Sequence, residues 1–203
     1  IHSDISDRSV GAGLRGERAG WQMDLSVVHG ASSFQFNVEN SVNASLGTSS
    51  PTSFDAGTLS FSQTVTNLDL LRKLDPWRLR SLSLVLGTEF RVENYAIGAG
   101  DPASWQLGDS LTDTMQPRVP GAQVFPGFRP DNEVDRTRNN VGAYVGLESQ
   151  LTSRIMFDIG GRFERYSDFG RSLIGKAAAR VELRKGLAVR GAVSTGFRAP
   201  SLH

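Results

Sequence analysis

The stretch IMFDIGGRFERY, residues 155–166, decides the fold. Its odd-numbered positions from Ile155 to Phe163 carry Ile, Phe, Ile, Gly and Phe, whereas the even-numbered positions from Met156 to Tyr166 carry Met, Asp, Gly, Arg, Glu and Tyr. Successive side chains of a β-strand point to opposite faces of its sheet. These residues therefore predict a strand with one apolar face and one charged face.

The same period of two recurs in other segments of roughly ten residues, which is the sequence signature of transmembrane barrel strands. The apolar phase changes at about Gly30, where Phe34, Phe36 and Val38 take over, so we expect a β-bulge there. In all, the pattern predicts about eight antiparallel strands. Besides 155–166, the clear segments are 21–27, 82–93, 141–150, 173–184 and 187–193, and the weaker ones are 10–17 and 59–71.

The connections between these segments alternate in length. Between the tight turns, longer connections are expected at 40–57 and 98–138, and a short one is expected at 167–171. In a bacterial outer-membrane barrel the tight turns face the periplasm and the long loops face outside. The order of connections is thus typical of such a barrel. Tight turns are expected at 18–20, 73–77, 152–154 and 185–186.

A soluble or surface β-sandwich that binds a ligand is the alternative, because an antiparallel sheet with one wet face also alternates. Two features weigh against it. The connection at 98–138, of ~40 residues, is far longer than compact domains usually contain. Neighbouring strands also carry a dense charged face, formed by Arg162, Glu164, Lys176, Arg180 and Glu182.

Composition narrows the function. The 203 residues include 22 Lys plus Arg against 21 Asp plus Glu, with no block of one sign. Nucleic acid is therefore not an expected partner, because phosphate contacts need a clustered basic face. The chain has no Cys, and no window approaches the ~18 apolar residues of a membrane-spanning helix. It opens at Ile1 without an initiator Met, so we expect an internal stretch of a longer, exported protein.

Motifs of enzymes and cofactor sites are weak. Residues 11–16, GAGLRG, match GxGxxG, but they lie inside an alternating strand and not between a strand and a helix. His2, His29 and His203 show no metal-ligand spacing, and there is no GxSxG elbow. Asn43 opens a glycosylation sequon that a bacterial barrel would not use. We therefore expect no catalytic residue, no metal site and no cofactor.

Aromatic side chains fall near the expected strand ends. Trp21 and Trp77 lie beside tight turns, and Tyr95, Tyr166 and Phe169 lie at the opposite ends. Aromatic girdles mark the two membrane interfaces of outer-membrane barrels. We therefore interpret these residues as girdle positions.

Several stretches resemble the TonB-dependent outer-membrane receptor family. GRFERYSDFG at 161–170 is similar to a hairpin of that family, KAAAR at 176–180 to the strand that follows it, and STGFRAPSL at 194–202 to a further segment. LGTEFRVE at 86–93 is similar to another of its strands. The resemblance is weakest in the long loops, where such receptors vary.

The resemblance implies an all-β fold, in which the chain forms an antiparallel segment of a transmembrane barrel of about 22 strands with a plugged lumen. Residues 1–203 would be a partial barrel domain, without the plug domain, the energy-coupling segment near the N-terminus and the aromatic C-terminal strand. Such receptors sit in the bacterial outer membrane, in contact with its lipid. They import a scarce solute such as a siderophore-iron complex, cobalamin or an oligosaccharide, powered by TonB and the inner-membrane energising complex.

Two groups of residues follow as candidate sites. One is a polar wall that faces the lumen and touches plug or solute, although mutual pairing without any ligand is the more ordinary role for each member. The other lies in the long loop, where aromatic rings and a cation suit a sugar or a catecholate ring equally. The wall residues are Glu89, Arg91, Glu93, Arg162, Glu164, Arg180 and Arg190, and the loop residues are Trp105, Phe125, Phe128 and Arg129.

Overall fold

The computed structural model describes residues 1–75, 79–108 and 119–202. They form one sheet of eight strands, each paired antiparallel with the next in sequence. A four-residue helix, α1 (Pro102–Trp105), lies in the connection after the fourth strand. The strands are β1 (His2–Arg18), β2 (Trp21–Glu39), β3 (Ser53–Leu74), β4 (Ser81–Gly98), β5 (Val134–Gln150), β6 (Ile155–Tyr166), β7 (Gly170–Arg184) and β8 (Leu187–Ser194).

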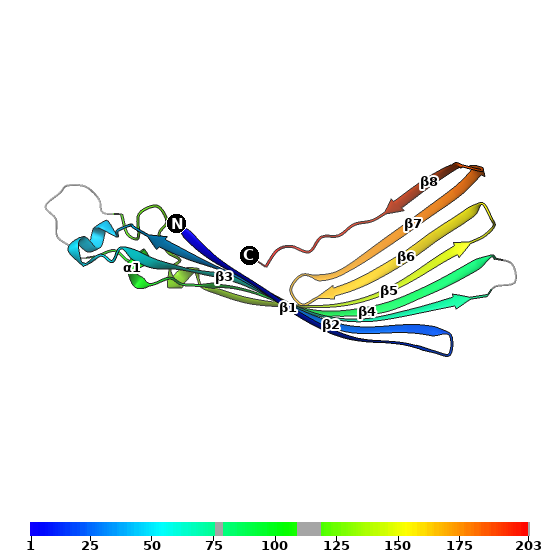
Figure 1. The fold of residues 1–203 in the computed structure, drawn as a ribbon, viewed down its shortest axis with the longest axis horizontal. Coiled ribbons are helices and arrows are strands. Elements are labelled where there is room, and N and C mark those ends of the chain that lie inside the picture. The colour runs from blue at the N-terminus through cyan, green and yellow to red at the C-terminus, as the bar shows by residue number, and fades with distance from the viewer. Residues whose placement is uncertain (76–78, 109–118, 203) are drawn as a thin grey trace.

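The sheet is a single curved layer (Figure 1). After β8 the chain runs back along the inside of the curve, where the backbone oxygen of Pro200 accepts a hydrogen bond from Arg138 on β5. We call the side that carries Arg138 the concave face and the other side the outward face. The antiparallel all-β prediction is confirmed. The β-sandwich alternative is wrong, because no second sheet covers either face within the described residues.

The outward face is apolar and uncovered. Alternation places the large apolar side chains of successive strands on this face, where cross-strand partners such as Leu25 and Leu68, or Phe163 and Leu173, lie side by side. Their exposed fractions are high even though the residues are apolar. Such a surface is stable in hydrocarbon and unstable in water. Its exposed members include Leu14, Leu25, Leu68, Phe90, Val141, Val145, Ile159, Phe163, Leu173 and Val193.

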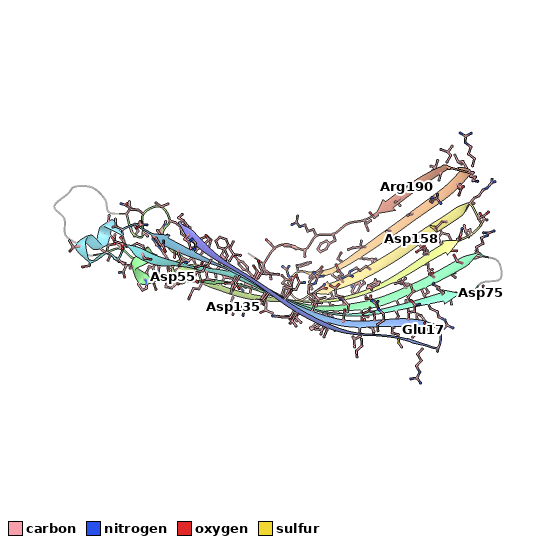
Figure 2. All side chains as sticks on the ribbon, in the orientation of Figure 1. Glu17, Asp55, Asp75, Asp135, Asp158 and Arg190 are labelled. Atoms are coloured by element: carbon pink, nitrogen blue, oxygen red, sulfur yellow. The ribbon has the colours of Figure 1, made fainter. Side chains whose placement is uncertain are left out.

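The connections sort to two ends. The turns after β1, β3, β5 and β7 lie at one end, which carries Glu17 and Asp75, whereas Asp55 lies towards the other end (Figure 2). The long connections and α1 gather at that second end (Figure 1). The predicted order of tight and long connections is confirmed where described, although part of the 73–77 turn lies outside the described residues. No helix among the described residues is long and apolar enough to cross a membrane.

The first five strands are longer than predicted. They have 17 to 22 residues, against the roughly ten needed to cross the membrane. β3 begins at Ser53 and β5 at Val134, which the sequence pattern assigned to loops. Both faces are polar or mixed along these extensions, so the alternation that reveals a strand is missing there. β6 and β7 are shorter and end midway along the sheet (Figure 1).

The bulge expected near Gly30 is wrong. β1 and β2 pair without interruption from Arg18 opposite Trp21 to His2 opposite Asn37. The register of β2 against β3 shifts later, between Gln35 and Asn37, where β3 contributes the extra residue next to Gly57, whose φ is +104°. Phe34, Phe36 and Val38 therefore stay on the concave face in unbroken alternation.

Phe34, Phe36 and Val38 make this end of the concave face apolar, and the chain folds over it there. Residues 40–52, 99–108 and 119–133, which we call the cap, cover this end of β2 and β3. Val38, Phe54 and Ala56 of the sheet are buried together with Ala122 of the cap, with Phe36, Ala103 and Phe125 packed around them. This is the buried apolar core of the described residues.

Asn43 ties the parts of the cap together. Its side chain is wholly buried, and its Nδ2 donates to the backbone oxygens of Ala103 and Gln106, each at 2.9 Å. Its Oδ1 accepts from the Ser45 hydroxyl at 2.6 Å. Its Oδ1 also accepts from the Ser45 backbone N–H at 3.1 Å, so all four hydrogen-bonding positions of the amide are used, two of them across sixty or more residues of sequence. The sequon at Asn43 marks a structural residue.

Candidate functional site: the polar wall of the concave face

Alternate residues of β4 begin a network of charges on the concave face. Glu89, Arg91 and Glu93 share this face because they are two residues apart in a strand. The Arg91 Nη2 donates to Glu89 Oε1 at 2.7 Å, and its Nη1 lies 3.7 Å from Glu93 Oε1. The two carboxylates are mostly buried by their neighbours. Arg91 thus neutralises both of them within its own strand.

β6 extends this network across the sheet. The Arg162 Nη2 lies 3.1 Å from Glu89 Oε2, and its Nε donates to Glu164 Oε1 at 2.8 Å. The Tyr166 hydroxyl donates to the other oxygen of Glu164 at 2.9 Å. Two strands that are separated by β5 are joined in this way. All five of these predicted wall residues, Glu89, Arg91, Glu93, Arg162 and Glu164, therefore lie together.

Arg138 completes the network and was missed by the sequence prediction, which placed it at the end of a loop. Its side chain is only 5% exposed, and its Nη2 lies 2.7 Å from Asp168 Oδ2 in the β6–β7 turn. A second contact reaches Glu93 Oε2 at 3.8 Å. Extending the period of two backwards from Asn140 would have placed Arg138 on the polar face.

Arg138 also anchors the segment after β8. Its Nη1 donates to the Pro200 backbone oxygen at 2.7 Å, and its guanidinium lies 5.2 Å from the Phe169 ring centroid. The hydrogen bond from Arg138 holds the pKa of Asp168 below its ordinary value. Phe169 in turn contacts Phe197 at 5.5 Å between ring centroids. One arginine thus joins β4, the β6–β7 turn and residues 197–200.

The resulting network, which we call the charge lattice, alternates in sign. It runs from Glu164 through Arg162, Glu89, Arg91, Glu93 and Arg138 to Asp168, with four carboxylates and three guanidinium groups. Pairs that share hydrogen bonds in this way polarise one another and fix their side chains. The lattice presents a firm, polar and nearly neutral surface.

One buried amide inside the lattice lacks a partner. Asn140 lies on β5 between Arg91 of β4 and Tyr166 of β6, and it is 2% exposed. Neither polar atom of its side chain, nor the Nε of Arg91, has a hydrogen-bond partner among the described residues. An unsatisfied buried polar group costs about 1–3 kcal/mol. The lattice therefore retains hydrogen-bonding capacity at its centre.

Arg180 and Arg190 lie apart from the charge lattice. They face each other across β7 and β8 on the concave face, and both are exposed. Neither has an ion pair within the described part of the chain. The sequence placed them on the correct face but could not show that β8 lies far from β4. Figure 2 shows Arg190 on the rising strand at the sheet edge.

Glycines hollow the concave face next to the lattice. Gly146 and Gly160 face each other across β5 and β6, and an open hollow of about 680 Å³ lies over them. Asp158 lines it and pairs with Lys176, whose Nζ is 2.9 Å from Oδ1. Beside this hollow the Tyr144 ring covers Gly87, where an added Cβ would overlap the ring.

The girdle interpretation is wrong for the tyrosines. Tyr166 donates to Glu164 and stacks on Phe169 at 4.3 Å between ring centroids, and Tyr95 lines the concave face beside Arg138. Both tyrosines lie near a strand end as expected, but the alternation of side chains along the strand places them on the concave face and not on the outward face. Trp21 lies on the outward face with Arg72, whose guanidinium is 5.5 Å from the Trp21 ring centroid. Trp77 lies outside the described residues.

The four loop candidates lie in the cap. Phe125 and Phe128 pack in a T-shaped pair at 5.9 Å, and both contact the Phe36 ring. The Trp105 Nε1 donates to the backbone oxygen of Gly100 at 3.0 Å. Arg129 is exposed. The rings of Trp105, Phe125 and Phe128 therefore make contacts that stabilise the cap, whereas Arg129 is the exposed one of the four candidates.

No group of three or more His, Cys, Asp or Glu side chains is arranged to hold a metal ion in the residues that the structure describes. The sheet can separate an apolar environment from a polar one. An antiparallel sheet with an apolar outward face and a polar, hydrogen-bonded concave face is a wall of a transmembrane β-barrel.

Comparisons with known proteins give the family. The family model described as TonB dependent receptor-like, beta-barrel, matches residues 2–203, and the chain belongs to this family of outer-membrane transport receptors. Among solved structures, the siderophore receptor PirA from Acinetobacter baumannii is similar in fold, with a TM-score of 0.68 at 16% sequence identity. The match covers 98% of this chain and 26% of that one. A comparison with curated protein sequences gave no match.

Proposed function

We propose that this chain forms about a third of the wall of a plugged outer-membrane barrel of about 22 strands, which imports a scarce solute by TonB-coupled transport. The observation that carries the proposal is the contrast between the two faces. The outward face exposes large apolar side chains, and the concave face carries the charge lattice. A water-soluble domain would gain nothing from that arrangement, whereas a barrel wall requires it.

The rest of the barrel and the plug are proposed to lie elsewhere in the full-length receptor. β1 and β8 each pair with one neighbour, so the sheet has two open edges in the described residues. Open edges are not tolerated in hydrocarbon, where every backbone group needs a partner. Further strands of the same receptor would satisfy them. The inferred partners are therefore the plug, TonB with its inner-membrane complex, membrane lipid and the solute.

The charge lattice is proposed to hold the plug. Its carboxylates and guanidinium groups neutralise one another, so no single residue is free to select a charged solute. The unpartnered amide of Asn140 and the Nε of Arg91 are suited to hydrogen bonds with a polar plug surface. Arg180 and Arg190, outside the lattice, are proposed to line the route nearer the tight-turn end.

The cap is proposed to meet the solute first. Arg129 is exposed there, next to the partly buried Phe128, which suits contact with an anionic or aromatic group. A siderophore-iron complex and cobalamin offer such groups, and an oligosaccharide could instead stack a sugar ring on Phe128. PirA is named a siderophore receptor, and its likeness to this chain supports the shared fold and leaves the solute open.

A transport assay tests this function. Cells that express the full-length receptor would be given radiolabelled ferric siderophores, cobalamin or maltooligosaccharides in turn. We expect one class to accumulate, and accumulation to stop when TonB is deleted or the proton gradient is collapsed. Accumulation that continues unchanged without TonB would indicate a passive channel and contradict the proposal.

A labelling experiment tests the orientation separately. Single cysteines would replace Ser49 in the cap and Asp75 at the tight-turn end, both of which are exposed. A membrane-impermeant thiol reagent should label Ser49→Cys in intact cells and Asp75→Cys only after the outer membrane is opened. The reverse pattern would invert the topology.

A further inference from the structure

Two arginines interrupt the apolar outward face. Arg165 on β6 and Arg171 on β7 are directly opposite each other, next to the pair formed by Phe163 and Leu173. Because Arg165 is two residues from Phe163, and Arg171 two residues from Leu173, all four side chains lie on the same, outward face. The charge lattice lies on the other face and cannot reach them.

Neither arginine is neutralised by the protein. Both are exposed, and neither has an ion pair or hydrogen-bonded side-chain partner in the described ranges. On the far side of Arg165 the cross-strand neighbour is Val141. The carboxylates closest in sequence, Glu164 and Asp168, are bound to Arg162 and Arg138 on the concave face. Like charges directly opposite in a sheet are destabilising, so this pair needs an anion from outside the wall.

The depth of the pair in the membrane follows from the length of β7. Its outward apolar positions run from Leu173 to Leu183. About ten residue steps of ~3.4 Å cover ~34 Å along the strand. A tilt of about 40° reduces this to ~26 Å, which matches the ~25 Å apolar band of outer-membrane barrels. Arg171 and Arg165 therefore lie two residue steps beyond the hydrocarbon, at the end nearer the cap.

We propose that Arg165 and Arg171 together bind the phosphate group of a lipid in the outer leaflet. This inference rests on the proposed membrane orientation. Two guanidinium groups on facing strands, with Cβ atoms about 5 Å apart, can donate in parallel to the oxygens of one phosphate. The phosphate cancels their repulsion, and the acyl chains of the same lipid cover Phe163 and Leu173. A free anion would bind the two guanidinium groups but would leave Phe163 and Leu173 uncovered.

Native mass spectrometry of the full-length receptor tests this site. The receptor would be purified in a neutral detergent and titrated with diphosphorylated lipid A, with phosphatidylcholine as the zwitterionic comparison. We expect Arg165→Gln/Arg171→Gln to lower the affinity for lipid A on the order of tenfold, with little change for phosphatidylcholine. Arg165→Lys/Arg171→Lys keeps the charge without the planar guanidinium group. Its affinity for lipid A should lie between that of the wild type and that of Arg165→Gln/Arg171→Gln.

The matched control is Arg180→Gln/Arg190→Gln, which removes a second pair of directly opposed arginines from the concave face. It should leave lipid A binding unchanged. Equal binding by wild type and Arg165→Gln/Arg171→Gln would overturn the inference. So would complete displacement of lipid A by inorganic phosphate, which would indicate a site for a free anion.

Failure of the inference can be separated from failure of the proposed function. Heat-modifiable migration of each variant in outer-membrane extracts reports whether the barrel has inserted. A receptor that inserts and binds lipid A regardless of Arg165 and Arg171 contradicts this site alone. A wild-type receptor that never enters the membrane contradicts the proposed function.

Discussion

The two ends of this sheet keep their apolar side chains in opposite places. Along the membrane-spanning part of β6 and β7, residues such as Ile159 and Leu173 point outward and contact no protein layer. Beneath the cap, Phe54 and Val38 point inward and are buried. Lipid solvates an apolar face in the first region, and only protein can do so in the second, where the strands have left the membrane. Polarity therefore follows the solvent outside each part of the wall.

Replacing Phe54 by Ala should give the largest effect, confined to the cap. Removal of a wholly buried Phe leaves a cavity and costs about 3–5 kcal/mol. We expect external protease to cleave the cap faster in intact cells, while heat-modifiable migration of the barrel is unchanged. Phe90→Ala is the control, since Phe90 lies on the outward face and lipid can fill its space. Faster cleavage of the cap in Phe90→Ala, with no faster cleavage in Phe54→Ala, would contradict this prediction.

Adjacent alanines on β7 offer a direct test of the two faces. Ala177 lies on the outward face opposite Ile159, midway along the apolar band, and Ala178 lies on the concave face opposite Asp158. Ala177→Arg should cost about 2–4 kcal/mol of barrel stability, because it places a charge at the membrane midplane. Ala178→Arg should cost little, since Asp158 can receive the new cation. Urea titration of the folded, heat-modifiable band measures both variants, and equal loss in both would contradict the assignment of faces.

A smaller effect is expected where the concave face is packed most closely. Gly87→Ala places a methyl group against the Tyr144 ring, and overpacking of this kind costs about 1–3 kcal/mol. Tyr144→Ala in the same chain should recover part of that loss, which a double-mutant cycle would measure. Gly98→Ala serves as control because nothing lies close to an added Cβ there. Identical losses at Gly87 and Gly98 would rule out the contact as the cause.

The smallest effect concerns the anchor at Arg138. The pKa of Asp168 is lowered in the folded protein, so the pair stabilises the fold above the ordinary carboxyl pKa of 3.8 and weakens as pH falls through the lower, folded pKa. Asp168 is partly exposed, which limits the effect to about 0.2–1 kcal/mol. A spin label at Arg198→Cys should become more mobile at acid pH. Asp168→Asn should make it mobile already at neutral pH, and Asp131→Asn should not. A label whose mobility ignores both pH and Asp168 would show that the pair does not hold this segment.

Alternation in the sequence was sufficient for the fold. Residues 155–166 and the segments like them predicted about eight antiparallel strands and put Glu89, Arg91, Glu93, Arg162 and Glu164 on one polar face. The reason is that a strand in a barrel wall separates lipid from a polar interior at every second residue. Where both faces become polar or mixed, as at 53–58 and 134–140, that signal disappears and the strand starts were predicted too late.

The tertiary structure alone decided which residues meet. Arg138 joins the charge lattice, while Arg180 and Arg190 stay outside it, because contact depends on register across strands far apart in sequence. The same holds for Phe36, whose inward-facing ring is contacted by Phe125 and Phe128 of the cap, far away in sequence. A local pattern fixes the face of a side chain through backbone geometry, but its partners are set by pairing and chain crossing, which no local pattern contains.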